Sequence, residues 1–199
     1  YSQLLRSLPK SGPLAQTVAP LFKQAMERAN QSLDPIAENR AALLALSKAY
    51  GGDKLLQMLG NTTPNRVFNT PKPYTIYKRK DLAQHYILSA GLALVADENV
   101  ASLIGLDKEI ADLAQGKTIS AWDLLADKAG ARLAENATRS AKSARHIQRT
   151  LSQARNDKDL LPDLGAEFEF SDDRFSIEEV ADLELLIELY LEQHTLLRK

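Results

Sequence analysis

Apolar side chains recur every three or four residues through most of the chain, which is the spacing of a helix that buries one face. This pattern predicts helices that begin at or near Leu14, Ile36, Asp53, Leu82, Asp97, Ser120 and Ser176. No heptad repeat is sustained, so a coiled coil is not expected. The pattern therefore predicts an all-α fold, an irregular bundle of about six to eight helices in a single domain, 1–199.

Proline and glycine mark the segments that the helices leave out. We expect an irregular N-terminal arm at 1–13, at most a short extended piece near 74–77, and a connector at 160–175 before the C-terminal helix, 176–197. Pro20 lies inside an otherwise helical pattern and should bend or restart that helix.

Several helix starts carry capping signals, in which a short polar side chain accepts a hydrogen bond from the first turn. These signals are Asp34 before Pro35, Asp81 with Gln84, Ser120 with Asp123, and Ser176 with Glu179. The helix that begins at Ser120 is expected to continue through Leu133 into a basic segment that ends near Arg155.

The composition is that of an ordinary globular protein, with 44% hydrophobic and 26% charged residues. A net charge of -1 gives no overall reason to expect a nucleic-acid or membrane binder. The absence of cysteine excludes disulfides and thiolate chemistry. The longest nearly apolar run, 86–96, is shorter than the roughly 20 residues that cross a bilayer, so no transmembrane segment is expected.

Four carboxylates lie close together in the sequence, on either side of one glycine-containing turn: Glu109, Asp112, Asp123 and Asp127. Within each pair the spacing is three or four residues, so the two acids share a helix face and repel each other by roughly 0.2–0.5 kcal/mol. A compensating positive group is therefore expected, such as Lys108, Lys128, an arginine, a protonated histidine or a bound cation.

The second pair of acids lies on the flank of its helix. The core stripe of that helix should contain Trp122, Leu125, Ala129 and Leu133, while Lys128, Arg132 and Glu135 point away from it. Asp123 and Asp127 fall between the two faces with Gly130, which would let another backbone approach closely.

His85 and Ser89 lie one turn apart on the neighbouring apolar helix, so both should form hydrogen bonds inside the protein. A structural role, a catalytic role and a ligand-binding role for His85 all stay open. No zinc motif or calcium-loop pattern occurs, so the sequence identifies no metal. A divalent cation bound by the acids is the cofactor hypothesis that stays open.

Three segments, "KRKDLAQHYILSAGLAL" (78–94), "IGLDKEIADL" (104–113) and "SAWDLLADKAGARLAE" (120–135), resemble an uncharacterised group of bacterial envelope-associated proteins. The pattern is also similar to the small YfiM-like predicted lipoproteins, and with 35–46 the likeness covers roughly residues 35–135. The resemblance implies no established activity. It marks as site residues His85, Ser89, Lys108, Glu109, Asp112, Ser120, Asp123, Asp127 and Gly130.

The sequence departs from this group at the turn before Ser120, where it reads Gly116-Lys117-Thr118-Ile119 instead of Gly-Ser-Gly-Phe. The resemblance, together with a first residue other than Met, leads us to expect a periplasmic or envelope-associated protein, with a cytoplasmic location still open.

A basic segment, 139–155, precedes an acidic one, 167–184. We expect the two to complement each other within the molecule, with a salt-sensitive homodimer as the alternative. Basic residues without interleaved aromatics make nucleic acid an unlikely partner.

Two functions follow from these patterns. The first is a helical binding or scaffold module for an unknown ligand or envelope protein, with a polar network inside it. The second is a hydrolase in which His85 is a general base, Glu109 or Asp112 an acid or orienting group, and Asp123 with Asp127 a cation site or substrate clamp.

Overall fold

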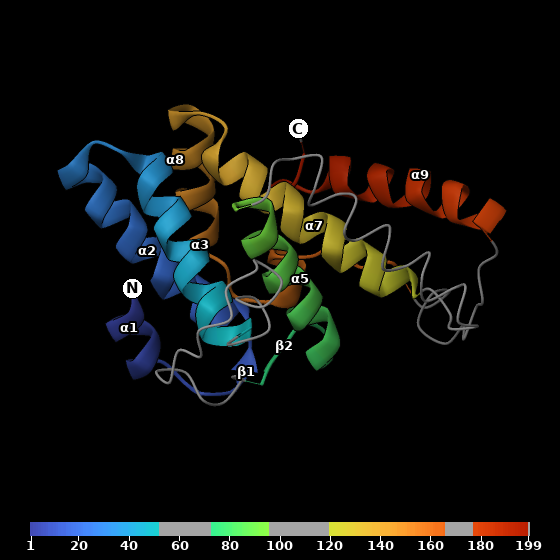
Figure 1. Cartoon of the computed structure of the whole chain (residues 1–199), viewed down its shortest axis with the longest axis horizontal. Helices are drawn as coiled ribbons and strands as arrows, with labels where there is room; N and C mark the ends of the chain where they lie inside the picture. Colours follow the sequence, from blue (N-terminus) through green and yellow to red (C-terminus); the bar gives the residue numbers. More distant parts are fainter. Residues whose placement is uncertain (52–72, 96–119, 166–176, 199) are drawn as a thin grey trace.

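The computed structural model describes residues 1–51, 73–95, 120–165 and 177–198. The described part contains seven α-helices, one 3₁₀ turn and a two-stranded sheet, which confirms the expected all-α fold (Figure 1). The helices are α1 (Ser2–Ser7), α2 (Ala15–Ser32), α3 (Pro35–Gly51), α5 (Lys80–Ala93), α7 (Ala121–Thr138), α8 (Ala141–Leu151) and α9 (Ile177–Gln193). The helices expected near Asp53 and Asp97 fall outside the described residues.

The small sheet joins the N-terminal region to the segment that leads into α5. Strand β1 (Gly12–Pro13) pairs in parallel with β2 (Tyr74–Thr75), and the Leu14 amide donates to the Thr75 carbonyl at 2.9 Å. The extended piece expected near 74–77 is therefore present. The irregular arm expected at 1–13 is wrong, because α1 forms there and buries Leu5 in the core.

Helix α2 runs through Pro20 as one element, so the expected restart does not occur. Proline removes one helical hydrogen bond. Val18 and Leu21 on either side of it are buried, together with Phe22 and Ala25 in the next turn. Burial of this apolar face outweighs the lost bond, because each fully buried side chain of this kind contributes about 1.5–3 kcal/mol.

The single helix expected from Ser120 to near Arg155 is wrong, because the chain turns between α7 and α8. Ser140 caps the second helix, since its hydroxyl accepts from the Ser143 amide at 3.2 Å. Buried Asn39 of α3 holds the turn from the other side by donating to the Ala137 and Ala144 carbonyls at 2.9 and 3.0 Å.

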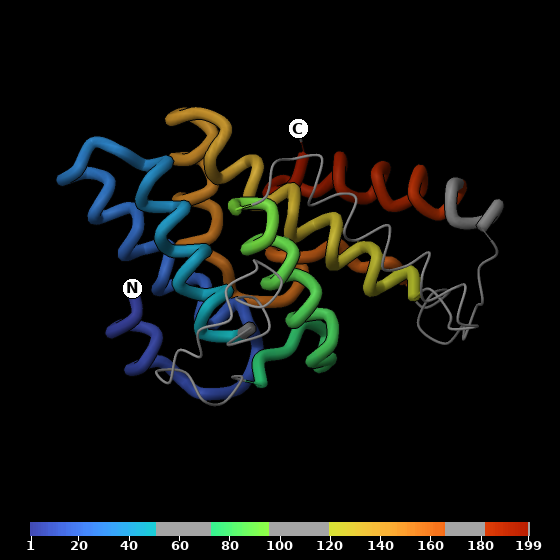
Figure 2. Tube along the Cα trace, in the orientation of Figure 1, coloured from blue at the N-terminus to red at the C-terminus, as the bar shows by residue number. Residues whose placement is uncertain are grey.

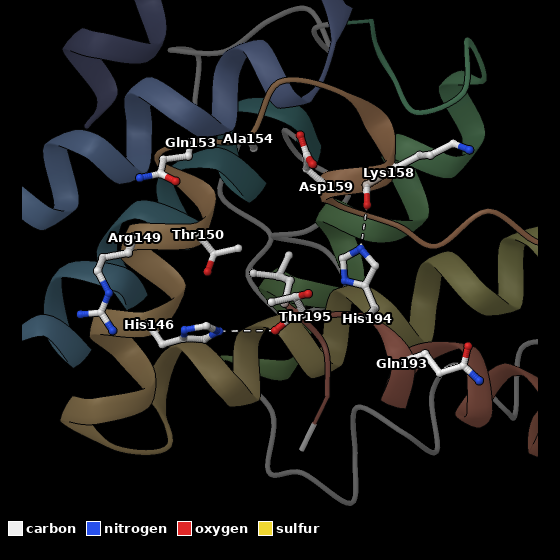
Figure 3. A pocket seen from close by; sticks show the side chains of 11 residues that line it. His146, Arg149, Thr150, Gln153, Ala154, Lys158, Asp159, Gln193, His194 and Thr195 are labelled. Atoms are coloured by element: carbon white, nitrogen blue, oxygen red, sulfur yellow. Dashed lines mark hydrogen bonds between the residues drawn. The ribbon is translucent and has the colours of Figure 1, made fainter.

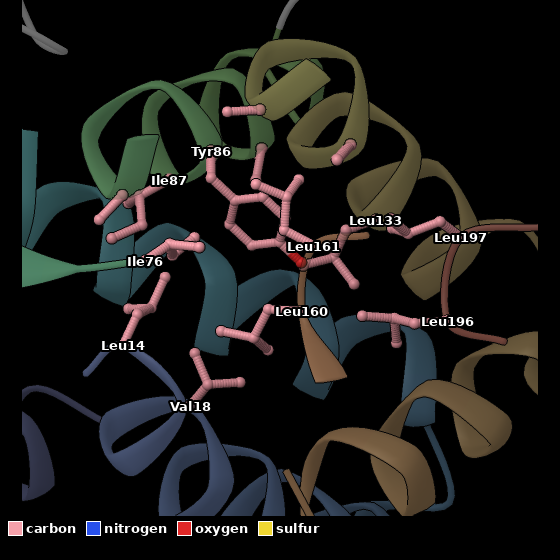
Figure 4. Packing of buried hydrophobic residues seen from close by; sticks show 14 of the residues in the cluster. Leu14, Val18, Ile76, Tyr86, Ile87, Leu133, Leu160, Leu161, Leu196 and Leu197 are labelled. Carbon is pink, nitrogen blue, oxygen red and sulfur yellow. The ribbon is translucent and has the colours of Figure 1, made fainter. Parts of the chain in front are cut away.

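The hydrophobic core lies between α5, α7 and the segments packed against them (Figure 4). Tyr86 and Ile87 of α5 meet Leu133 of α7 there, with Leu160 and Leu161 from the connector below. Helices α5 and α7 lie side by side in the trace (Figure 2).

Helix α9 lies along α7 and covers part of it (Figure 1). Its buried stripe includes Leu183, Ile187 and Leu191, which recur at helical spacing. Arg132 was expected to point away from the core. It is only 6% exposed, because α9 covers it and supplies Glu188 and Glu192 as its carboxylate partners.

Candidate functional site

The candidate site lies where the polar flanks of α5 and α7 face each other. His85 and Ser89 are one turn apart on α5, and Asp123 and Asp127 are one turn apart on α7. Ser120 fixes the start of α7 by accepting a hydrogen bond from the Asp123 amide at 3.3 Å, as the sequence predicts. The start of α7 at Ser120 and the packing of α7 against α5 together place these side chains opposite one another.

Gly130 sets how closely the two helices approach. A Cβ atom on Gly130 would lie 2.1 Å from the carbonyl oxygen of Tyr86, the residue next to His85. No side chain larger than hydrogen fits at that distance. The prediction that Gly130 lets another backbone come close is therefore confirmed.

Asp127 is the acceptor at the centre of the site. His85 Nδ1 donates to its Oδ2 at 2.9 Å, and the Ser89 hydroxyl donates to its Oδ1 at 2.5 Å. An ionised carboxylate can only accept a hydrogen bond, so the hydrogen between His85 and Asp127 is bonded to His85 Nδ1. The expectation that His85 and Ser89 form hydrogen bonds inside the protein is confirmed.

Asp123 is much less well satisfied than Asp127. Among the described residues its nearest partners are Arg79 Nη2, 3.5 Å from Oδ1, and His85 Nε2, 3.9 Å from Oδ2, and both distances exceed those of strong hydrogen bonds. Burial raises the pKa of Asp123 above its ordinary value, and the nearby His85 charge opposes that shift without cancelling it. The side chain is nevertheless 25% exposed, so a small ligand could reach it.

Arg79 is a member of the site that the sequence analysis missed. It occupies the N-cap position of α5 and forms a salt bridge with Asp81 at 2.6 Å. The capping box expected from Asp81 and Gln84 is wrong: α5 begins with no side-chain cap, because Arg79 binds the Asp81 carboxylate. The sequence signal for this salt bridge was a basic residue, Arg79, two positions before Asp81.

Arg79 also controls the charge of Asp81. Burial alone would raise the pKa of Asp81, but the hydrogen bond and positive charge of Arg79 outweigh it and hold that pKa below the ordinary value. Asp81 and Asp123 therefore have pKa values shifted in opposite directions around one guanidinium.

Four other predicted residues are not seen at this cluster in the described ranges. Lys108, Glu109 and Asp112 lie outside the described residues. Lys128 does not compensate the acids; its Nζ lies 3.2 Å from Glu184 and 3.6 Å from Glu188 on α9. The positive groups beside Asp123 are instead Arg79 and, when protonated, His85.

A metal would need more ligands than this part of the site supplies. Across the described ranges, no group of three or more His, Asp or Glu side chains is arranged to hold an ion. His85 and Asp123 alone would give a two-ligand site, below the four that a structural zinc site uses. The geometry instead allows His85, oriented by Asp127, to exchange a proton and Asp123 to accept a donor.

The expected pairing of the basic segment, 139–155, with the acidic segment, 167–184, stays a prediction. Glu184 pairs with Lys128 of α7, and none of the exposed basic residues of α8 forms an ion pair with a described acid. Most of the acidic segment lies outside the described residues. The salt-sensitive homodimer stays a prediction.

None of the helices in the described ranges combines the length and the apolar character that a membrane crossing requires. No family model, no curated protein and no solved structure matches the chain.

Proposed function

We propose that the chain is a helical binding module that takes up its ligand at the cluster of Arg79, His85, Asp123 and Asp127. The ligand group is positively charged or donates hydrogen bonds, and it binds the Asp123 carboxylate. The periplasmic or envelope location, and an envelope protein as partner, belong to this proposal and are supported by the resemblance of residues 35–135 alone.

The observation that carries the proposal is the weak satisfaction of Asp123. A partly buried carboxylate loses hydration, and a short hydrogen bond normally replaces it. In the described ranges the nearest donors to Asp123 are 3.5 and 3.9 Å away, and burial raises the pKa of Asp123. A ligand cation or N–H group at Asp123 would restore the missing interaction.

Asp127 supports this reading by its contrast with Asp123. Both of its oxygens are occupied by short bonds from His85 and Ser89, so it positions the imidazole and has little capacity for a ligand. The site thus combines one fixed carboxylate with one that is available, which is how a preorganised binding site is built.

Thermal melting with defined probes tests the proposal. The probes are Mg²⁺, Ca²⁺ and Zn²⁺, each with an EDTA control, and the amines ethanolamine and glucosamine. A probe at tenfold its Kd should raise the Tm of the wild-type protein by about 3–6 °C. Asp123→Asn should abolish that rise.

Glu135→Gln is the matched control, because Glu135 lies on α7 outside the cluster. It removes the same charge from the same helix, so the Tm rise should persist in this variant. A wild-type protein that responds to none of the probes counts against the proposal, and so does a response that survives Asp123→Asn.

A hydrolase is the second candidate, favoured by the orientation of His85. Its Nδ1 is held by Asp127 at 2.9 Å, which is the arrangement that orients a catalytic imidazole as a general base. Ser89 donates to Asp127, so its hydroxyl is not placed for attack through His85 and the nucleophile would be water.

Initial rates with p-nitrophenyl acetate and p-nitrophenyl phosphate test this candidate, with and without Mg²⁺. His85→Ala should lower kcat/KM by about 100-fold or more while circular dichroism stays unchanged, with His146→Ala as control. Turnover that His85→Ala leaves intact contradicts a general-base role. A large loss of stability in His85→Ala assigns the histidine a structural role instead.

A further inference from the structure

A second site lies on different elements from the His85 cluster. A pocket of about 650 Å³ opens between α8 and the segment that follows α9 (Figure 3). That volume is within the range of pockets that hold small molecules, roughly 300–1,000 Å³. The residues that carry its chemistry are His146, Arg149, Thr150, Gln153, His194 and Thr195.

The pocket continues the basic face of α8. Lys142, Arg145 and Arg149 of α8, with Arg139 just before the helix, follow one another at intervals of three or four residues, while the opposite face of α8 is buried. In the part of the chain that the structure describes, none of the four forms an ion pair. Arg149 brings this uncompensated charge to the pocket.

The acidic residue of the pocket, Asp159, already accepts hydrogen bonds from backbone amides. Asp159 Oδ2 accepts the amides of Arg155 and Asn156 at 2.7 and 3.0 Å, so much of its charge is stabilised locally. Lys158 directs its ammonium group to Asp163 at 3.0 Å, away from the pocket. Arg149 is therefore the charged side chain of the pocket that has no partner among the described residues.

His194 holds the wall opposite α8. Its Nε2 donates to the Lys158 carbonyl at 2.8 Å, and burial lowers its pKa, so the ring is neutral near pH 7. This bond fixes the segment after α9 in place. On the other side, His146 lies beside Arg149 on α8 and reaches the Thr195 carbonyl at 3.4 Å.

The remaining polar residues that line the pocket are available to form hydrogen bonds with a ligand. Within the described residues, the side chains of Thr150, Gln153 and Gln193 make no hydrogen bond to the protein. Hydroxyl and amide groups both donate and accept, so they match the hydroxyl groups of a ligand. Arginine, with its planar set of donors, matches a phosphate.

We propose that this pocket binds a phosphate ester of a hydroxylated compound. The phosphate contacts Arg149, with His146 beside it, and the ligand hydroxyls contact Thr150, Gln153 and Gln193. The same chemistry is found in a free phosphorylated polyol and in the glycerol phosphate headgroup of an anionic lipid.

Two binding measurements separate these sources. Calorimetry uses sn-glycerol 3-phosphate, with glycerol as the uncharged control. Sedimentation uses vesicles of phosphatidylcholine with and without phosphatidylglycerol. Each is carried out with the wild-type protein, with Arg149→Ala, and with Lys142→Ala, which removes the same charge from the same helix outside the pocket.

We expect binding in at least one measurement, weakened at least fivefold by Arg149→Ala and less than twofold by Lys142→Ala, with circular dichroism unchanged in both. Binding to sn-glycerol 3-phosphate identifies a free ligand, and binding to phosphatidylglycerol vesicles alone identifies a headgroup. Equal effects of the two variants would indicate a diffuse charged surface and overturn the proposal, as would the absence of binding in both measurements.

Discussion

Gly130 of α7 lies directly against the backbone of Tyr86 of α5, so that a Cβ atom at position 130 would be 2.1 Å from the Tyr86 carbonyl oxygen. His85 is the residue just before Tyr86 on α5, and Asp127 precedes Gly130 by about one turn of α7. The contact that brings the two helices together therefore also sets the distance between His85 and Asp127, which is 2.9 Å between Nδ1 and Oδ2.

Gly130→Ala should destabilise the protein by about 1–3 kcal/mol, because the added methyl group forces the helices apart. Helix propensity alone predicts the opposite sign, a gain of about 1 kcal/mol. Urea unfolding measures the change, with Ala131→Gly as the baseline for propensity. A stabilised Gly130→Ala protein would show that the close contact is absent.

Asp127→Asn should cost about 1–3 kcal/mol, because it removes a carboxylate oxygen that accepts a bond from His85 or Ser89. A double-mutant cycle with Ser89→Ala should give a coupling energy of about 0.5–3 kcal/mol. Ser143→Ala, which removes a hydroxyl bonded to the Asn136 carbonyl, is the distant control and should show no coupling to Asp127.

The features that the sequence predicted correctly are those that nearby residues determine. Asp34 accepts a hydrogen bond from the Ala37 amide at 2.9 Å and Ser120 accepts one from Asp123, so both starts depend only on the next few residues. The same holds for the pairs on the flanks of α5 and α7, because a spacing of four residues places two side chains on one face in any helix.

The errors occurred where distant contacts decide the structure. The turn between α7 and α8 is held by Asn39, about a hundred positions earlier, and the burial of Arg132 depends on α9. Arg79 was missed because Asp81 had a local explanation as a cap, and only the folded chain shows a cation competing for that carboxylate.

Asn39→Ala should destabilise the protein by about 1–3 kcal/mol, since it leaves buried carbonyls without a donor. Asn39 is fully buried and also accepts a hydrogen bond from Gln148 Nε2 at 2.8 Å. Asn30→Ala on the exposed face of α2 is the control and should change the unfolding free energy by less than about 0.5 kcal/mol. Equal small effects would argue against this buried network.

Asp123 and Asp81 should influence the pH dependence of stability in opposite directions. The folded-state pKa of Asp123 is raised, so its contribution is complete below the ordinary Asp value and is lost as the pH rises through the shifted value. The pKa of Asp81 is lowered, so its contribution is present above the ordinary value and is lost as the pH falls through the shifted one.

Urea unfolding at several pH values between about 3 and about 7 measures both effects, because this window spans the titration of carboxylates. Asp123→Asn should gain stability relative to wild type as the pH rises, whereas Asp81→Asn should lose it. The same direction of change in both variants would contradict the opposite roles assigned to them around Arg79.

The availability of Asp123 for a ligand is tested most directly by a pH titration of its carboxyl carbon in NMR. The titration is run on the free protein and with the probe that raises the Tm most. The account predicts a pKa above the ordinary Asp value in the free protein, which falls when the bound probe stabilises the charge. A pKa at or below the ordinary value, or one that the bound probe leaves unchanged, would contradict it.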